Sequence, residues 1–144
     1  MNININRSAL NICSACNLKC KHCLAFIPYY KKTHIMSYSE AKSILEHYFA
    51  VVDNVKHFTV TGGEPLLNKD VLPILEEVMK YKRHIGETLD FVTNATMMIP
   101  NEVQDFFEAN KDSTRIVLSD YGPDLSKKLN SIQNDLDNRG IVYR

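Results

Sequence analysis

Four cysteines lie close together near the N-terminus of this chain, and the remaining sequence contains no others: Cys13, Cys16, Cys20 and Cys23. Thiolates packed this densely repel one another and oxidise readily unless a soft, positively charged centre binds them. The loops between them are also very short for disulfide bridges. A metal ion or an iron–sulfur cluster is therefore the expected ligand.

The spacing of the cysteines allows three kinds of site. Two C-x2-C pairs could form a tetrahedral zinc site, although zinc ribbons usually place a longer loop between their pairs than the three residues between Cys16 and Cys20. All four thiolates could hold a closed 4Fe–4S cluster. Three thiolates would leave one iron open, as a catalytic metal requires. The spacing favours a cluster over zinc and leaves the closed and open forms undecided.

The composition narrows the class of partner. Lys+Arg and Asp+Glu both number 17, so the formal net charge is zero. A binder of nucleic acid or of an acidic membrane surface needs a positive field, so neither partner is expected. No apolar run approaches the roughly 18–20 residues of a membrane span, and the N-terminus lacks the apolar core of a signal peptide. We expect a cytoplasmic, reducing location, where clustered cysteines act as ligands.

Strand-like apolar runs alternate with amphipathic helical runs along the chain. Strands are expected within 3–12 and at 57–61, 89–93 and 115–119, with a fifth beginning at 141–143. Helices are expected from the capping box at 37–40, through 72–79, from Pro100, and over 125–136. This alternation predicts an α/β domain over residues 1–144 with a parallel sheet. An open doubly wound sheet and part of a β/α barrel both fit the pattern.

Polar or glycine-containing motifs follow each expected strand, at the edge where parallel β/α proteins place their sites. The cysteines follow the first strand, the segment 61–65 follows the second, Asn94 the third, and Ser119–Asp120 the fourth. The glycine pair at 62–63 permits close approach of a ligand to the main chain, and the carboxylate of Glu64 suits a ligand ammonium group. Taken singly, the glycine pair is most often only a turn, and Asn94 or Ser119 with Asp120 could equally be helix caps.

Together these motifs resemble the radical S-adenosylmethionine (radical SAM) family. The segment 16–23 matches its C-x3-C-x2-C signature, and 61–65 matches its GGE motif. The segments 91–94 and 117–120 are similar to its third-strand and fourth-strand motifs. The resemblance covers nearly the whole chain, and it implies a partial (β/α) barrel with about four β/α units here plus a fifth strand.

The resemblance also implies roles for individual residues. A 4Fe–4S cluster would be bound through three thiolates, and the fourth iron would bind the methionine part of S-adenosylmethionine. Gly62, Gly63 and Glu64 would receive its amino group. His22 would lie near the adenine, and the candidates for ribose or carboxylate contacts are Asn94, Ser119 and Asp120. The three metal ligands would be Cys16, Cys20 and Cys23, with Cys13 outside the family pattern.

The implied activity is reductive cleavage of S-adenosylmethionine to a 5′-deoxyadenosyl radical, which takes hydrogen from a substrate that the sequence does not identify. Catalytic residues beyond the cofactor sites are not assigned. A reductant such as a flavodoxin or ferredoxin is expected. Family members typically have six β/α units, so a domain truncated at its C-terminal side is expected, with an oligomer contact or second chain covering the open sheet edge. The alternatives are a zinc-stabilised binding module and a closed-cluster electron-transfer protein.

Overall fold

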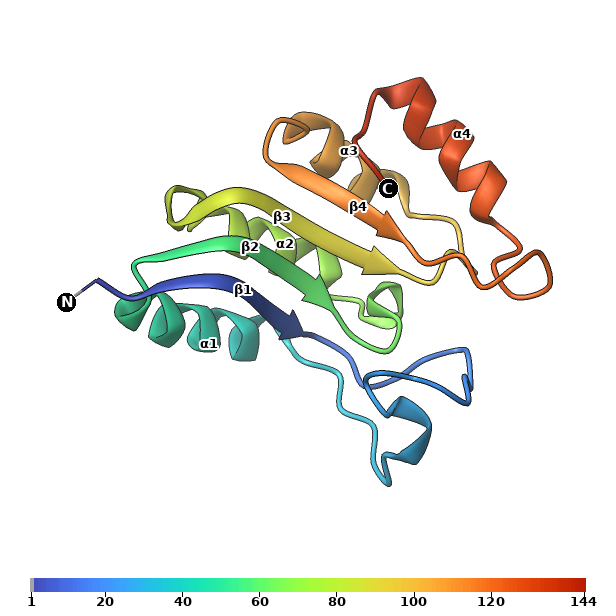
Figure 1. Ribbon diagram of the computed structural model, residues 1–144, viewed down its shortest axis with the longest axis horizontal. Coiled ribbons are helices and arrows are strands. Elements are labelled where there is room, and N and C mark those ends of the chain that lie inside the picture. The colour runs from blue at the N-terminus through green and yellow to red at the C-terminus, as the bar shows by residue number, and fades with distance from the viewer. Residues whose placement is uncertain (1) are drawn as a thin grey trace.

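The computed structural model describes residues 2–144 and contains one four-stranded parallel sheet in the order β1-β2-β3-β4. The strands are β1 (Asn4–Asn11), β2 (Asn54–Thr61), β3 (Ile85–Thr93) and β4 (Thr114–Leu118). All four point the same way, so the loops that follow them gather at one edge (Figure 1). The prediction of an α/β fold with parallel strands is confirmed.

The helices alternate with the strands. They are α1 (Tyr38–Val51), α2 (Val71–Met79), α3 (Asn101–Ala109) and α4 (Leu129–Arg139), with short 3-10 turns at Ile27–Tyr29, Pro65–Leu67 and Lys82–His84. The expected cap of α1 is present, because the Ser37 side chain accepts a hydrogen bond from the backbone N–H of Glu40 at 3.3 Å. Gly140 ends α4 with φ 63°, a conformation that favours glycine.

One face of the sheet forms the core. Phe58, Leu89, Phe91 and Ile116 are buried on this face, and α2 and α3 lie behind it in Figure 1. Burying each such side chain contributes about 1.5–3 kcal/mol relative to leaving it exposed. This packing fixes the strands firmly, and with them the loops at their carboxyl ends.

Two local predictions differ from the structure. The expected helix over 125–136 begins only at Leu129, because Ser126 is buried in the preceding turn, where its hydroxyl lies within hydrogen-bond distance of the carbonyls of Ser119 at 3.1 Å and Asn94 at 3.2 Å. The expected fifth strand is limited to a single parallel bridge between Ile116 and Tyr143. The described chain ends at the residue after this bridge, and only β4 is available there as a neighbour.

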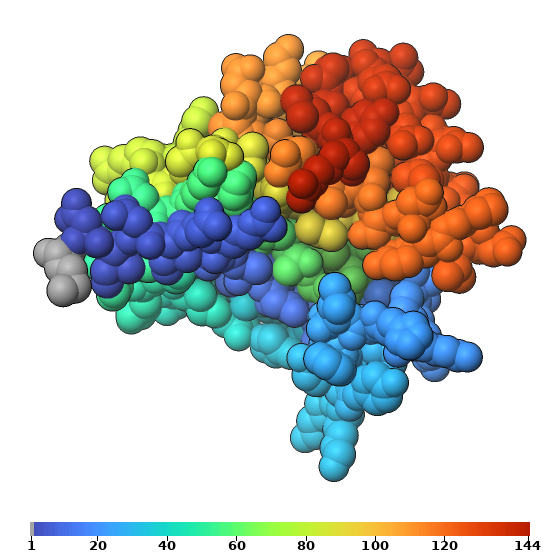
Figure 2. All heavy atoms as spheres, in the orientation of Figure 1, coloured from blue at the N-terminus to red at the C-terminus, as the bar shows by residue number. Residues whose placement is uncertain are grey.

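The segment that follows the first cysteines is the least integrated part of the fold. In Figure 2 this light-blue segment projects from the body of the molecule. The side chain of Leu24 there is 97% exposed, and Phe26 has a left-handed backbone conformation with φ 54°. Among residues 2–144, no helix has the length and apolar character that a membrane crossing requires.

Candidate cofactor site at the strand ends

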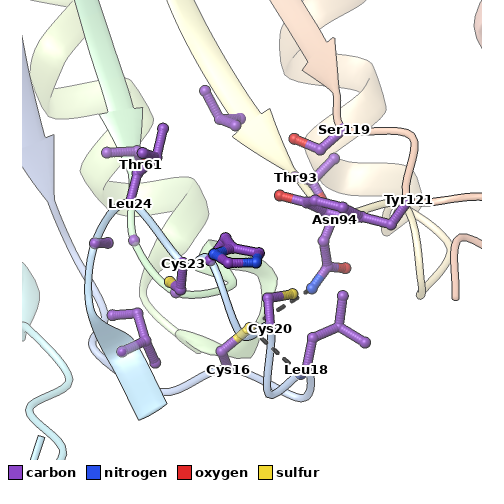
Figure 3. Close-up of a pocket in the computed structure, with 16 residues that line it drawn as sticks. Cys16, Leu18, Cys20, Cys23, Leu24, Thr61, Thr93, Asn94, Ser119 and Tyr121 are labelled. Atoms are coloured by element: carbon purple, nitrogen blue, oxygen red, sulfur yellow. Dashed lines mark hydrogen bonds between the residues drawn. The ribbon is translucent and has the colours of Figure 1, made fainter. Parts of the chain in front are cut away.

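A cavity of about 390 Å³ opens at the carboxyl edge of the sheet. Segments from all four strand ends contribute to it, and Figure 3 shows their side chains facing a common space. Eight residues predicted as site residues line it: Cys16, Cys20, His22, Cys23, Gly62, Gly63, Asn94 and Ser119. The remaining lining is largely apolar: Leu18, Leu24, Ala25, Ile27, Thr61, Val92, Thr93 and Tyr121. The fold therefore brings most of the separate motifs to one site.

The four cysteines divide into three and one. Cys16, Cys20 and Cys23 are half-buried and line the cavity, whereas Cys13 is 1% exposed and lies outside its lining. The Cys13 sulfur accepts a hydrogen bond from the backbone N–H of Ala15 at 3.3 Å. Burial raises the pKa of the Cys13 thiol, so its neutral form is favoured there.

The separation of Cys13 from the other three cysteines indicates which inorganic group these residues can bind. Within residues 2–144, no three Cys, His, Asp or Glu side chains are grouped to hold a metal ion. In a cluster each cysteine binds a separate iron, so the thiols surround a volume instead of a point. Three soft thiol donors around an open cavity fit this demand, and the position of Cys13 does not favour a four-cysteine tetrahedral site.

The glycine pair after β2 allows the cysteine loop to pack directly against it. The Gly63 N–H donates to the Cys13 carbonyl at 2.6 Å, and the Glu64 N–H donates to the Ala15 carbonyl at 2.9 Å. A Cβ atom at Gly62 would lie 2.5 Å from the Cys13 carbonyl oxygen, and one at Gly63 would lie 2.9 Å from the Cys16 Cβ. Both positions thus need glycine for close backbone contact with the loop that carries the cysteines.

Glu64 lies beneath the cavity and is not part of its lining. Its side chain is completely buried and accepts hydrogen bonds from the Leu66 N–H at 3.0 Å, the Thr93 hydroxyl at 2.9 Å and the Asn94 N–H at 2.8 Å. Burial raises the pKa of this carboxyl group, while these three hydrogen bonds oppose the rise. The contact of Glu64 with a ligand ammonium group stays a prediction, and in this structure the carboxylate connects the ends of β2 and β3.

Asn94 joins the end of β3 to the cysteine loop. Its Nδ2 donates to the Asn17 Oδ1 at 2.9 Å and lies 3.8 Å from the Cys16 sulfur. The Asn17 Nδ2 in turn donates to the Thr96 hydroxyl at 2.6 Å. The next residue, Ala95, is fully buried with φ 55°, an unusual conformation for alanine that places the turn under strain. Asn94 can thus support a cysteine ligand as well as face the cavity.

The segment after β4 closes the remaining side. Ser119 lines the cavity, and its N–H donates to the Thr93 carbonyl at 2.9 Å. Asp120 is exposed and lies outside the cavity, because its carboxylate accepts the Gly122 N–H at 2.8 Å within a turn. The cofactor contact of Asp120 stays a prediction, and in this structure its carboxylate stabilises the turn. Tyr121, which sequence reasoning missed, lines the cavity instead.

A parallel α/β sheet with three thiols at its carboxyl edge defines a class of cofactor-dependent β/α proteins. The sequence model of the radical SAM superfamily matches residues 10–139. The chain therefore belongs to the radical SAM superfamily, and membership implies a 4Fe–4S cluster and S-adenosylmethionine.

Curated relatives agree with this assignment. The chain is 29% identical over 140 residues to a GTP 3′,8-cyclase of Lactiplantibacillus plantarum, covering 94% of this chain and 41% of that protein. A GTP 3′,8-cyclase of Campylobacter lari is 26% identical over 122 residues, covering 83% of this chain and 36% of that protein. The chain thus spans about two fifths of the length of these relatives.

A solved structure has the same fold. It is that of polyhistidine-tagged anSMEcpe with bound AdoMet, and it superposes with a TM-score of 0.71 at 21% sequence identity. The match covers 97% of this chain and 42% of that chain.

Proposed function

We propose that this domain binds a 4Fe–4S cluster through Cys16, Cys20 and Cys23 and uses S-adenosylmethionine for radical chemistry on a substrate. The observation that carries the proposal is the convergence of the three signature thiols, the glycine pair and Asn94 on one cavity. When bound, the cluster would supply the electron that cleaves the carbon–sulfur bond of S-adenosylmethionine.

The chain's own residues would bind, orient and shield this cofactor. Gly62 and Gly63 bring the cysteine loop against the sheet and leave the cavity floor free of side chains. Asn94 and Ser119 supply polar groups at the opposite wall. Leu18 and Ile27 supply apolar surface that limits water around a reactive intermediate.

We further propose that the sheet is the N-terminal part of a partial barrel. The β4 edge carries only the short bridge at Tyr143, and the matched relatives extend well beyond this length. Further β/α units, supplied by additional chain or by a partner, would complete the barrel and most of a substrate pocket.

The exposed Lys19 and Lys21 beside the cysteines fit an acidic reductant such as a flavodoxin or ferredoxin.

The proposed function is tested by reductive cleavage of S-adenosylmethionine. The protein is reconstituted anaerobically with iron and sulfide, mixed with S-adenosylmethionine and dithionite, and assayed for 5′-deoxyadenosine by chromatography. We expect formation in the wild type and in Cys13→Ala, because Cys13 is outside the cavity. Cys20→Ala, which removes a cavity thiol, should lose both the cluster and the product.

Two outcomes would count against the proposal. A colourless protein that binds zinc alone would support the binding-module alternative. Equal loss of the cluster in Cys13→Ala and Cys20→Ala would make all four cysteines ligands and support a closed electron-transfer cluster.

A further inference from the structure

A second, smaller cavity of about 180 Å³ lies on the sheet face opposite the helices. Neighbouring strands place its polar residues side by side: Thr59 pairs with Asp90, and Asp90 pairs with Arg115. Between β1 and β2, Arg7 pairs with His57. Its full lining is Arg7, His57, Thr59, Asp90, Val92, Arg115, Val117 and Arg144.

This cavity continues directly from the candidate cofactor site. Val92 lines both cavities. On β2, Thr59 lines the second cavity and Thr61 the first. At the end of β4, Val117 lines the second cavity and Ser119, the residue after the strand, lines the first. Residues two apart on a strand face the same side at a spacing of about 7 Å. The second cavity is therefore one layer of side chains deeper along the same face of the sheet.

A buried ion pair holds one cationic group at the floor of this second cavity. Asp90 is 5% exposed and binds Arg115 in a bidentate manner, with Nε–Oδ1 at 3.1 Å and Nη2–Oδ2 at 2.8 Å. A paired guanidinium held in this way presents its remaining N–H groups in a fixed direction. Asp90 thus orients Arg115 and neutralises only one positive charge.

The cavity keeps a surplus of positive charge. Arg144 reaches Asp90 only at 3.8 Å, and Arg7 has no ion-pair partner within residues 2–144. His57 is already paired with Glu87 at 3.2 Å. Three guanidinium groups therefore surround a single carboxylate. A parallel sheet usually carries apolar side chains on both faces, so a charged row here is unusual. Arg7 and Arg144 are exposed to solvent, which leaves both guanidinium groups accessible to an anionic ligand.

We propose that this second cavity is a subsite for an anionic group of the substrate, a phosphate or a carboxylate. The proposal rests on the proposed function, since it places the substrate between the cofactor cavity and Arg115. A small acid or phosphate ester with its anionic end at Arg7 and Arg115 would extend its other end past Val92 toward Ser119. The class of substrate is therefore a small anionic metabolite.

The test measures anion binding by calorimetry on the full chain, with and without the reconstituted cluster. Pyrophosphate and glutarate serve as the phosphate and carboxylate probes. Arg7→Gln removes a cation without an ion-pair partner among residues 2–144 and should weaken binding about tenfold. Lys111→Gln, an exposed cation beyond α3, is the matched control and should leave binding unchanged.

A second variant, at Arg115, shows whether weaker binding is a property of the cavity and not of Arg7 alone. Arg115→Lys keeps the charge and loses the bidentate geometry, so it should also weaken binding while circular dichroism stays native. Tighter binding of one probe identifies the phosphate or carboxylate class. No saturation at about 10 mM of either probe, or equal weakening by Lys111→Gln, would overturn the proposal. Because binding needs no cleavage of S-adenosylmethionine, its failure is distinct from failure of the proposed function.

Discussion

Gly63→Ala is expected to prevent stable incorporation of the cluster. The added Cβ would lie 2.8 Å from the Ala15 carbonyl carbon and 2.9 Å from the Cys16 Cβ, and it would also clash with the Ala15 carbonyl oxygen. These contacts are with backbone and with the first atom of a ligand side chain, so no flexible group can yield. The cysteine loop must therefore move away from β2, which separates Cys16 from the other thiols.

Iron and sulfide content after anaerobic reconstitution, with visible absorbance, measures this effect. We expect Gly63→Ala to retain clearly less iron than the wild type, because each ~1.4 kcal/mol lost to the loop displacement weakens cluster binding about tenfold. Gly86→Ala is the matched control, since its Cβ would have no neighbour nearer than 3.8 Å. Wild-type iron content in Gly63→Ala would show that the close contact is not required.

Glu64→Ala is expected to lower the free energy of unfolding by about 3 kcal/mol. The substitution removes the carboxylate that accepts hydrogen bonds from Thr93, Asn94 and Leu66. Residue 64 is fully buried, so water cannot replace this acceptor. Each buried donor left without a partner costs about 1–3 kcal/mol, and the relief of burying a carboxylate offsets part of this loss. The end of β3 should loosen as a result, together with the Asn94 contact to the cysteine loop.

Anaerobic urea denaturation followed by circular dichroism provides the measurement. Glu64→Gln should lose less stability than Glu64→Ala, because its amide oxygen can still accept two of the three hydrogen bonds. Glu76→Ala, at an exposed position on α2, is the control and should stay within about 0.5 kcal/mol of the wild type. Equal stability of Glu64→Ala and Glu76→Ala would mean that Glu64 has no supporting role.

The sequence was sufficient to predict the order of elements and the gathering of motifs at one edge. Hydrophobic periodicity reports which residues face the core, and Phe58, Phe91 and Ile116 follow it. Parallel connections then require the four strand ends to meet. The cysteines of the signature, Gly62, Gly63, Asn94 and Ser119 therefore line the same cavity.

Side-chain direction within the strand-end loops was not predictable in the same way. Glu64 and Asp120 have types suited to a ligand, but backbone N–H groups nearby offer each carboxylate a local partner. Asn17 and Tyr121 were missed because no periodicity applies in loops. A useful signal was the polar character of Asn17 between two cysteines, since the backbone and side chains of such loops need hydrogen-bond partners.

The central claim is that three cysteines hold a cluster whose remaining iron is available to S-adenosylmethionine. Electron paramagnetic resonance of the dithionite-reduced, reconstituted protein tests it most directly, with Cys13→Ala measured beside the wild type. We predict that S-adenosylmethionine changes the shape and g values of the cluster signal in both proteins, since Cys13 lies outside the cavity. A signal that S-adenosylmethionine leaves unchanged, or that disappears in Cys13→Ala, would contradict the claim.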